Sequence, residues 1–151
     1  MVLNEFKTRF PDFGFSILAT DISTRVLKEA AAGIYTEEDI APVSMQYRKK
    51  YLLRSKNREK KLVRIVPELR HLVQFGRLNF MDENYGIRDT MQVIFCRNVI
   101  IYFDRTTQEI MLNRLCSHLM SGGYIFMGHS ETLSGLDVPL KQVLSSVYQK
   151  I

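Results

Sequence analysis

The hydrophobic pattern of the chain centres on a short apolar run that ends abruptly in polar residues. Residues 92–96 (Gln-Val-Ile-Phe-Cys) are mostly apolar and β-favouring, which is typical of a strand buried on both faces of a parallel sheet. Arg97 and Asn98 follow directly, and Asp104 can cap the helix predicted over 105–120. Ligands of open α/β sheets bind at the carboxyl ends of strands. Arg97 and Asn98 are therefore candidate ligand residues, unless they only pair with nearby acids and cap a loop.

The rest of the pattern alternates between strand and helix. Ser23 can cap a helix over 24–32, and Gly33 can end it. Further helical periodicity covers residues 1–10, and strands are predicted at 15–19, 124–128, 140–143 and 147–151. This order predicts an α/β fold, a doubly wound sheet with an antiparallel terminal hairpin.

A different pattern occupies the middle of the chain. Residues 51–53, 62–66 and 71–75 are short strand candidates, and a polar loop precedes the second of them. We expect them to form a small antiparallel insert outside the main sheet. Residues 34–42 are predicted to be irregular, and 44–51 to be either helical or extended.

Charge is concentrated in this insert. The 151 residues, enough for one domain, carry a formal net charge of +5. Residues 48–64 contain nine Lys or Arg and one acid, Glu59. Such a segment can face an acidic partner, a nucleic-acid backbone or only solvent.

The composition argues against several kinds of chemistry. The three histidines are scattered without metal-ligand spacing, and neither cysteine belongs to a C-x-x-C pair. We expect no metal site and reduced thiols. No apolar run approaches a membrane span, and no basic-then-apolar leader is present. We therefore expect a cytoplasmic protein without direct membrane insertion.

Four phrases occur in order along the chain: residues 19–27 (ATDISTRVL), 76–80 (GRLNF), 95–104 (FCRNVIIYFD) and 128–131 (GHSE). Together they resemble the CheR-type chemotaxis methyltransferases, which use S-adenosylmethionine to methylate glutamates on chemoreceptors. The resemblance runs from about Phe15 to the end. It implies a Rossmann-like methyltransferase sheet, with 1–151 as a single partial domain and a β-subdomain insert at about 45–76.

The resemblance also implies residue roles. Asp21 would bind the ribose hydroxyls of S-adenosylmethionine, and Asn79 and Phe80 would lie against its adenine. Arg97 and Asn98 would line the crevice near the cofactor. Tyr102 would lie close to the transferring methyl and the incoming carboxylate, which makes Arg97 and Tyr102 the catalytic candidates.

Taken without the resemblance, these residues have simpler interpretations. Asp21 at a strand end can cap the next helix, and Tyr102 can be a half-buried aromatic in an apolar loop. For His129 and Glu131 we expect loop packing and helix capping.

The chain departs from the family pattern at its start. The first strand and its Gly-rich turn, of the type G-x-S-x-G-E-E-P-Y-S, are missing. The sequence therefore predicts a chain that begins inside the first helix of the cofactor domain. Without that central strand, the sheet has edges to cover, which predicts a homodimer, strand exchange or rearranged pairing. In some family members the insert docks a receptor C-terminal peptide over a glycine-shaped loop, but loop 55–61 contains no glycine.

Three functions remain open. In the enzyme reading, the basic insert steers toward the acidic helices of a chemoreceptor cytoplasmic region. The chain can also be an inactive interaction module of the same fold. The third is a nucleic-acid binder that uses Lys49, Lys50, Arg54, Arg58 and Lys61. Few aromatics interleave with these charges, which disfavours stacking on bases.

Overall fold

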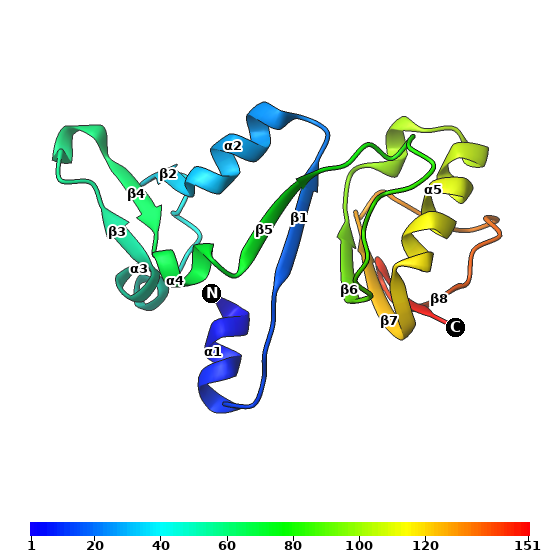
Figure 1. Ribbon diagram of the computed structural model, residues 1–151, viewed down its shortest axis with the longest axis horizontal. Coiled ribbons are helices and arrows are strands. Elements are labelled where there is room, and N and C mark those ends of the chain that lie inside the picture. The colour runs from blue at the N-terminus through cyan, green and yellow to red at the C-terminus, as the bar shows by residue number, and fades with distance from the viewer. The chain divides into compact units, whose positions relative to one another are not determined.

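A computed structural model describes the backbone of residues 1–151 and every side chain except that of Arg58. The chain divides into two compact units, Met1–Asn79 and Phe80–Ile151, which are described in turn (Figure 1).

The first unit contains the predicted strand–helix pair. Helix α1 (Val2–Arg9) precedes strand β1 (Ile17–Asp21), which lies two residues later than predicted, and helix α2 (Thr24–Ala32) follows. The Oγ of Ser23 accepts the N–H of Val26 at 3.3 Å, and Gly33 ends α2 with φ = 60°. Both caps are as predicted, because each depends only on local backbone geometry.

A three-stranded antiparallel sheet forms the insert, in the order β2 (Ile34–Thr36), β4 (Leu62–Ile65), β3 (Leu52–Arg54). Helix α3 (Met45–Tyr51) leads into β3, and the short helices η1 (Arg58–Lys60) and α4 (Pro67–Arg70) flank β4. The prediction of an antiparallel insert is confirmed, but the strands that form it are not all the predicted ones. The expectation that 34–42 is irregular is wrong for Ile34–Thr36, which pairs with β4, and is confirmed for residues 37–42.

The predicted insert strand at 71–75 was assigned to the wrong sheet. The observed strand β5 (Val73–Arg77) pairs in parallel with β1, with Ile17 opposite Val73 and Asp21 opposite Arg77. Gly76 lies beside Leu18 and Thr20 of β1, and a Cβ at Gly76 would stay 3.8 Å or more from them. Short apolar runs indicate a strand without naming its partner, because pairing is decided by residues far away in the sequence.

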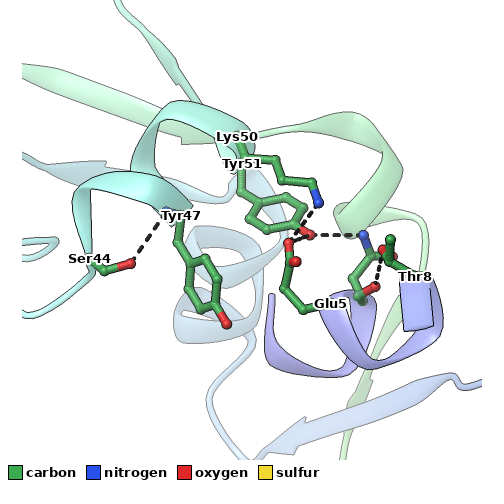
Figure 2. Close-up of polar contacts among 7 residues, drawn as sticks. Glu5, Thr8, Ser44, Tyr47, Lys50 and Tyr51 are labelled. Carbon is green, nitrogen blue, oxygen red and sulfur yellow. Dashed lines mark hydrogen bonds and ion pairs between the residues drawn. The ribbon is translucent and has the colours of Figure 1, made fainter. Parts of the chain in front are cut away.

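A polar cluster joins α1 to α3 within the first unit (Figure 2). Glu5 Oε1 accepts hydrogen bonds from Lys50 Nζ at 2.8 Å and from the hydroxyl of Tyr51, and Asn4 Nδ2 donates to that hydroxyl at 3.1 Å. The hydrogen bond from Lys50 lowers the pKa of Glu5, and the same bond raises the pKa of Lys50. This cluster therefore stabilises the folded unit while Glu5 is ionised.

Replacing Glu5 with glutamine should reduce the decrease in Tm that occurs as the pH is lowered. The Glu5 pKa is depressed on folding, so its contribution is present above the unfolded pKa and is lost as pH falls through the folded pKa. Wild-type Tm should therefore fall more than that of Glu5→Gln between pH 6 and about 3. Thermal unfolding by circular dichroism measures this, with the exposed Glu38→Gln as the matched control. Parallel Tm profiles for wild type and Glu5→Gln would contradict the assignment.

The second unit is a four-stranded sheet in the order β6-β7-β9-β8. Strand β6 (Met91–Cys96) leads through η2 (Ile100–Tyr102) and helix α5 (Arg105–Ser117) to β7 (Leu119–Met127), and β6 and β7 are parallel. Strands β8 (Leu140–Leu144) and β9 (Val147–Lys150) form the predicted terminal hairpin. The α/β fold with a parallel crossover and antiparallel end is confirmed.

Helix α5 ends earlier than predicted. It stops at Ser117, and Leu119 belongs to β7. Residues 121–123, expected to end this helix, are instead part of an irregularity in the pairing of β7 with β6, where Gly122 has φ = 75°. Only glycine adopts this conformation at little cost, which suits a bulge as well as a helix end.

The core of the second unit lies between α5 and one face of the sheet. Its fully buried members include Met111 and Leu112 from α5, and Leu119, Ile125 and Met127 from β7. The expectation that β6 is buried on both faces is wrong: the Phe95 side chain is 72% exposed and stacks on Phe126 at 4.8 Å. The physical reason is that α5, the single α-helix of this unit, covers only one face.

Strands β1 and β6, which carry candidate site residues at their carboxyl ends, are edge strands of their sheets. Strand β1 pairs with β5 alone, and β6 pairs with β7 alone. Each edge presents backbone N–H and C=O groups that can pair with a further strand.

Candidate functional site

Asp21 lies at the carboxyl end of β1. Its Oδ1 accepts the N–H of Ser23 at 2.8 Å, so the helix-entry role anticipated from the sequence is present. This bond orients the carboxylate. The backbone oxygen of Asp21 also accepts the N–H of Leu78 at 3.1 Å, which joins the end of β1 to the residues after β5.

Asn79 and Phe80 follow the carboxyl end of β5 and span the boundary between the units. Asn79 thus shares with Asp21 the carboxyl edge of the parallel pair β1–β5. Phe80 packs against the second-unit core, with its ring 5.9 Å from the ring of Tyr85, and its backbone oxygen accepts the Tyr85 hydroxyl at 3.2 Å.

Arg97, Asn98 and Tyr102 belong to one loop that leaves the carboxyl end of β6. Arg97 and Asn98 are exposed, and Asn98 has φ = 57°, a left-handed conformation that asparagine tolerates better than most residues. Tyr102, in η2, is 80% exposed, so the alternative interpretation of Tyr102 as a half-buried aromatic is wrong. These three predicted site residues are therefore brought together on one exposed loop.

Two side chains from outside this loop hold its backbone. Glu131 accepts the N–H groups of Asn98, Val99 and Ile100 at 2.7–3.0 Å, so it binds the loop backbone, whereas the cap of α5 is Asp104. Gln108 of α5 donates to the backbone oxygens of Ile100 and Phe103 at 2.9 and 2.8 Å. Sequence reasoning missed Gln108, because an amide on a predicted helix gives no signal of what it contacts.

The thiol at the end of β6, on Cys96, is buried, as is the thiol of Cys116 in α5. Burial and the negative charge of Glu131 raise the pKa of Cys96 to about 12, and burial raises the pKa of Cys116 to about 11. Both thiols stay protonated at neutral pH, where the thiolate is the reactive form.

The described side chains contain no group of three or more His, Cys, Asp or Glu that could hold a metal ion. No helix among the described residues is long and apolar enough to cross a membrane.

Some of the basic side chains of the insert already make polar contacts within the fold. Arg48 donates to the backbone oxygens of Val43 and Ala41 at 2.7 and 2.6 Å, and Lys50 pairs with Glu5. A cavity of about 500 Å³ is lined by Glu37, Ile40, Met45, Arg48, Lys49, Leu52, Arg54 and Val63. The Arg58 side chain, one of the five bases considered for nucleic-acid binding, lies outside the described part of the structure.

The fold and the polar strand ends define the class: a Rossmann-like α/β protein with candidate ligand residues at the carboxyl ends of parallel strands. Residues 1–149 match the family model described as CheR methyltransferase, SAM binding domain. The chain belongs to the CheR methyltransferase family.

Named relatives agree with this family. The chain is 39% identical over 122 residues to the chemotaxis protein methyltransferase of Salmonella typhimurium, covering 81% of this chain and 42% of the relative. It is 38% identical over 139 residues to that of Borreliella burgdorferi (92% and 48%), and 43% identical over 121 residues to that of Klebsiella aerogenes (78% and 41%). The chain thus spans less than half the length of these relatives.

Proposed function

We propose that the chain is part of an enzyme that transfers the methyl group of S-adenosylmethionine to glutamate side chains of chemoreceptors. One observation carries the proposal: β1 pairs in parallel with β5, and β6 pairs in parallel with β7. The carboxyl ends of β1, β5 and β6 lead into the polar residues Asp21, Asn79 and Arg97–Asn98. The family description and the names of the relatives support the choice of cofactor and reaction. We also propose that 1–151 is one partial methyltransferase domain, with the three-stranded sheet as its insert.

The residues present suit the adenosyl part of the cofactor. The carboxylate of Asp21 can accept hydrogen bonds from ribose hydroxyls, and Ser23 already orients it. The amide of Asn79 both donates and accepts, as adenine recognition requires, and Phe80 supplies an apolar ring at the next position of the chain. Arg97 and Asn98 complete the proposed cofactor site.

Bound S-adenosylmethionine supplies a methyl group attached to a positively charged sulfur. A glutamate carboxylate is ionised near neutral pH and is already a competent nucleophile. The chain's own residues need only orient this carboxylate and exclude water. Arg97, exposed on its loop, can hold it through a forked contact. Tyr102 can donate a hydrogen bond or pack its ring beside the positive charge.

The proposed partner is the acidic helical region of a chemoreceptor, which the protein would bind in the cytoplasm. Lys49 and Arg54 line the insert cavity and supply positive charge to steer toward it. The unpaired edges of β1 and β6 suit pairing with a further strand, from the same protein or from a second copy as a homodimer or by strand exchange.

Replacing Asp21 with asparagine should weaken binding of S-adenosylmethionine by about tenfold to 100-fold. Asparagine keeps the acceptor for Ser23 but loses the charge, and a hydrogen bond to a charged group contributes about 1.5–3 kcal/mol. Calorimetric titration of the complete gene product measures the affinity. Asp12→Asn is the matched control, because Asp12 is an exposed aspartate in the turn before β1.

Labelled methyl transfer onto a chemoreceptor cytoplasmic fragment tests the reaction itself. Transfer to glutamates supports the proposal. Cofactor binding without transfer would favour the inactive interaction module, and absence of both would overturn the proposal. DNA binding with a steep salt dependence would instead favour the nucleic-acid reading.

A further inference from the structure

Glu131 stands apart from the other charged side chains of the molecule. Among the described residues it is the one charged side chain that is buried, with 6% of its surface exposed. It forms no ion pair with a described residue. Burying an unpaired charge is costly, so a residue kept for stability alone would more often be apolar.

The carboxylate is satisfied entirely by backbone N–H groups. Oε2 accepts from Asn98 at 3.0 Å and from Gly128 at 2.5 Å, and Oε1 accepts from Val99 at 2.7 Å and from Ile100 at 3.0 Å. A carboxylate offers about four acceptor positions, so its capacity is used. Bonds of this charge-assisted kind are stronger than those between neutral groups.

Three of these donors are consecutive residues of the loop that carries the candidate site. One carboxylate therefore fixes the turn that starts at Asn98, including its left-handed backbone. Gln108 fixes the other end through the oxygens of Ile100 and Phe103. Arg97 directly precedes the stretch that these two side chains hold, and Tyr102 lies within it.

We propose that Glu131 is a positioning residue for methyl transfer: it holds the loop so that Arg97 and Tyr102 meet the substrate carboxylate in a fixed orientation, with Gln108 as its counterpart at the loop's end. This role rests on the proposed function. Glu131 does not itself contact the reacting atoms, since its four acceptor positions are occupied by the chain's own backbone. Its contribution is to the geometry of the exposed groups.

The Glu131→Gln variant of the complete gene product tests this role. Glutamine has nearly the same shape, but its NH₂ group would face two N–H donors instead of accepting from them. We expect kcat for labelled methyl transfer to fall about 100-fold, the scale of a small misplacement of reacting groups. We expect the KM for the receptor fragment to change much less. Amide hydrogen exchange at Asn98, Val99 and Ile100 should accelerate in the same variant.

Leu112→Ala is the control for a merely structural effect. Leu112 is a core residue of the same unit that makes none of the hydrogen bonds holding the loop, and its truncation destabilises the fold. Both variants are assayed at a temperature where circular dichroism shows them folded. Leu112→Ala should keep wild-type kcat, and Glu131→Gln should not.

The outcomes separate this role from the proposed function. An active wild type with an equally active Glu131→Gln variant would overturn the positioning role alone, as would equal losses of kcat in the two variants. A wild-type protein that transfers no methyl would overturn the proposed function and, with it, this role.

Discussion

The substitution Gly128→Ala should lower the free energy of unfolding of the second unit by about 3 kcal/mol. A Cβ at this position would lie 2.5 Å from Asn98 Oδ1, 2.7 Å from Glu131 Oε2 and 3.0 Å from the backbone nitrogen of Asn98. The Asn98 side chain can move, but Glu131 is held by four hydrogen bonds and the Asn98 nitrogen is backbone. The added methyl therefore has to displace the loop or break the carboxylate's bonds.

Denaturant unfolding followed by circular dichroism measures this change. Gly14→Ala is the control, because a Cβ at Gly14 meets nothing within 4 Å. Its effect should stay within about 0.5 kcal/mol. If Gly128→Ala proved as mild as Gly14→Ala, the tight approach of β7, Asn98 and Glu131 would be wrong.

The substitution Leu112→Ala should lower the free energy of unfolding of the second unit by about 3 kcal/mol, within the usual range of about 2–5 kcal/mol. Leu112 is 0% exposed and belongs to the cluster between α5 and the sheet. Truncation removes buried methyl groups and leaves a cavity that the surrounding side chains fill only partly. Denaturant unfolding at neutral pH measures the loss.

Ile110→Ala on the same helix is the matched control. Its side chain is 47% exposed, so truncation removes less buried surface while the helix receives the same alanine. Its cost should be about 1 kcal/mol or less. Equal losses in the two variants would mean that α5 does not present Leu112 to the core.

Much of the local structure followed from the sequence because its causes are local. The Ser23 and Asp104 caps and the Gly33 stop each satisfy groups within a few residues, and all three are found as predicted. The terminal hairpin closes over two residues, so its pairing needs no distant information. The polar residues that end β1 and β6 could be picked out for the same reason: an abrupt change from apolar to polar marks a strand end.

The sequence was less informative wherever a partner lies far along the chain. Val73–Arg77 is a short strand whose sequence fits either sheet, and only its pairing with β1, more than fifty residues earlier, places it in the parallel pair. Likewise, the exposure of Phe95 depends on which face α5 covers, which periodicity within β6 cannot state.

The sequence by itself determined the α/β class, the family and the candidate residues Asp21, Asn79, Phe80, Arg97, Asn98 and Tyr102, because caps, strand ends and motifs are written in neighbouring residues. Only the tertiary structure decided which strands pair and what holds the loop after β6. Glu131 binds that loop from more than thirty residues away along the chain. Every residue except proline has a backbone N–H, so the sequence of the loop does not show that Glu131 accepts from it.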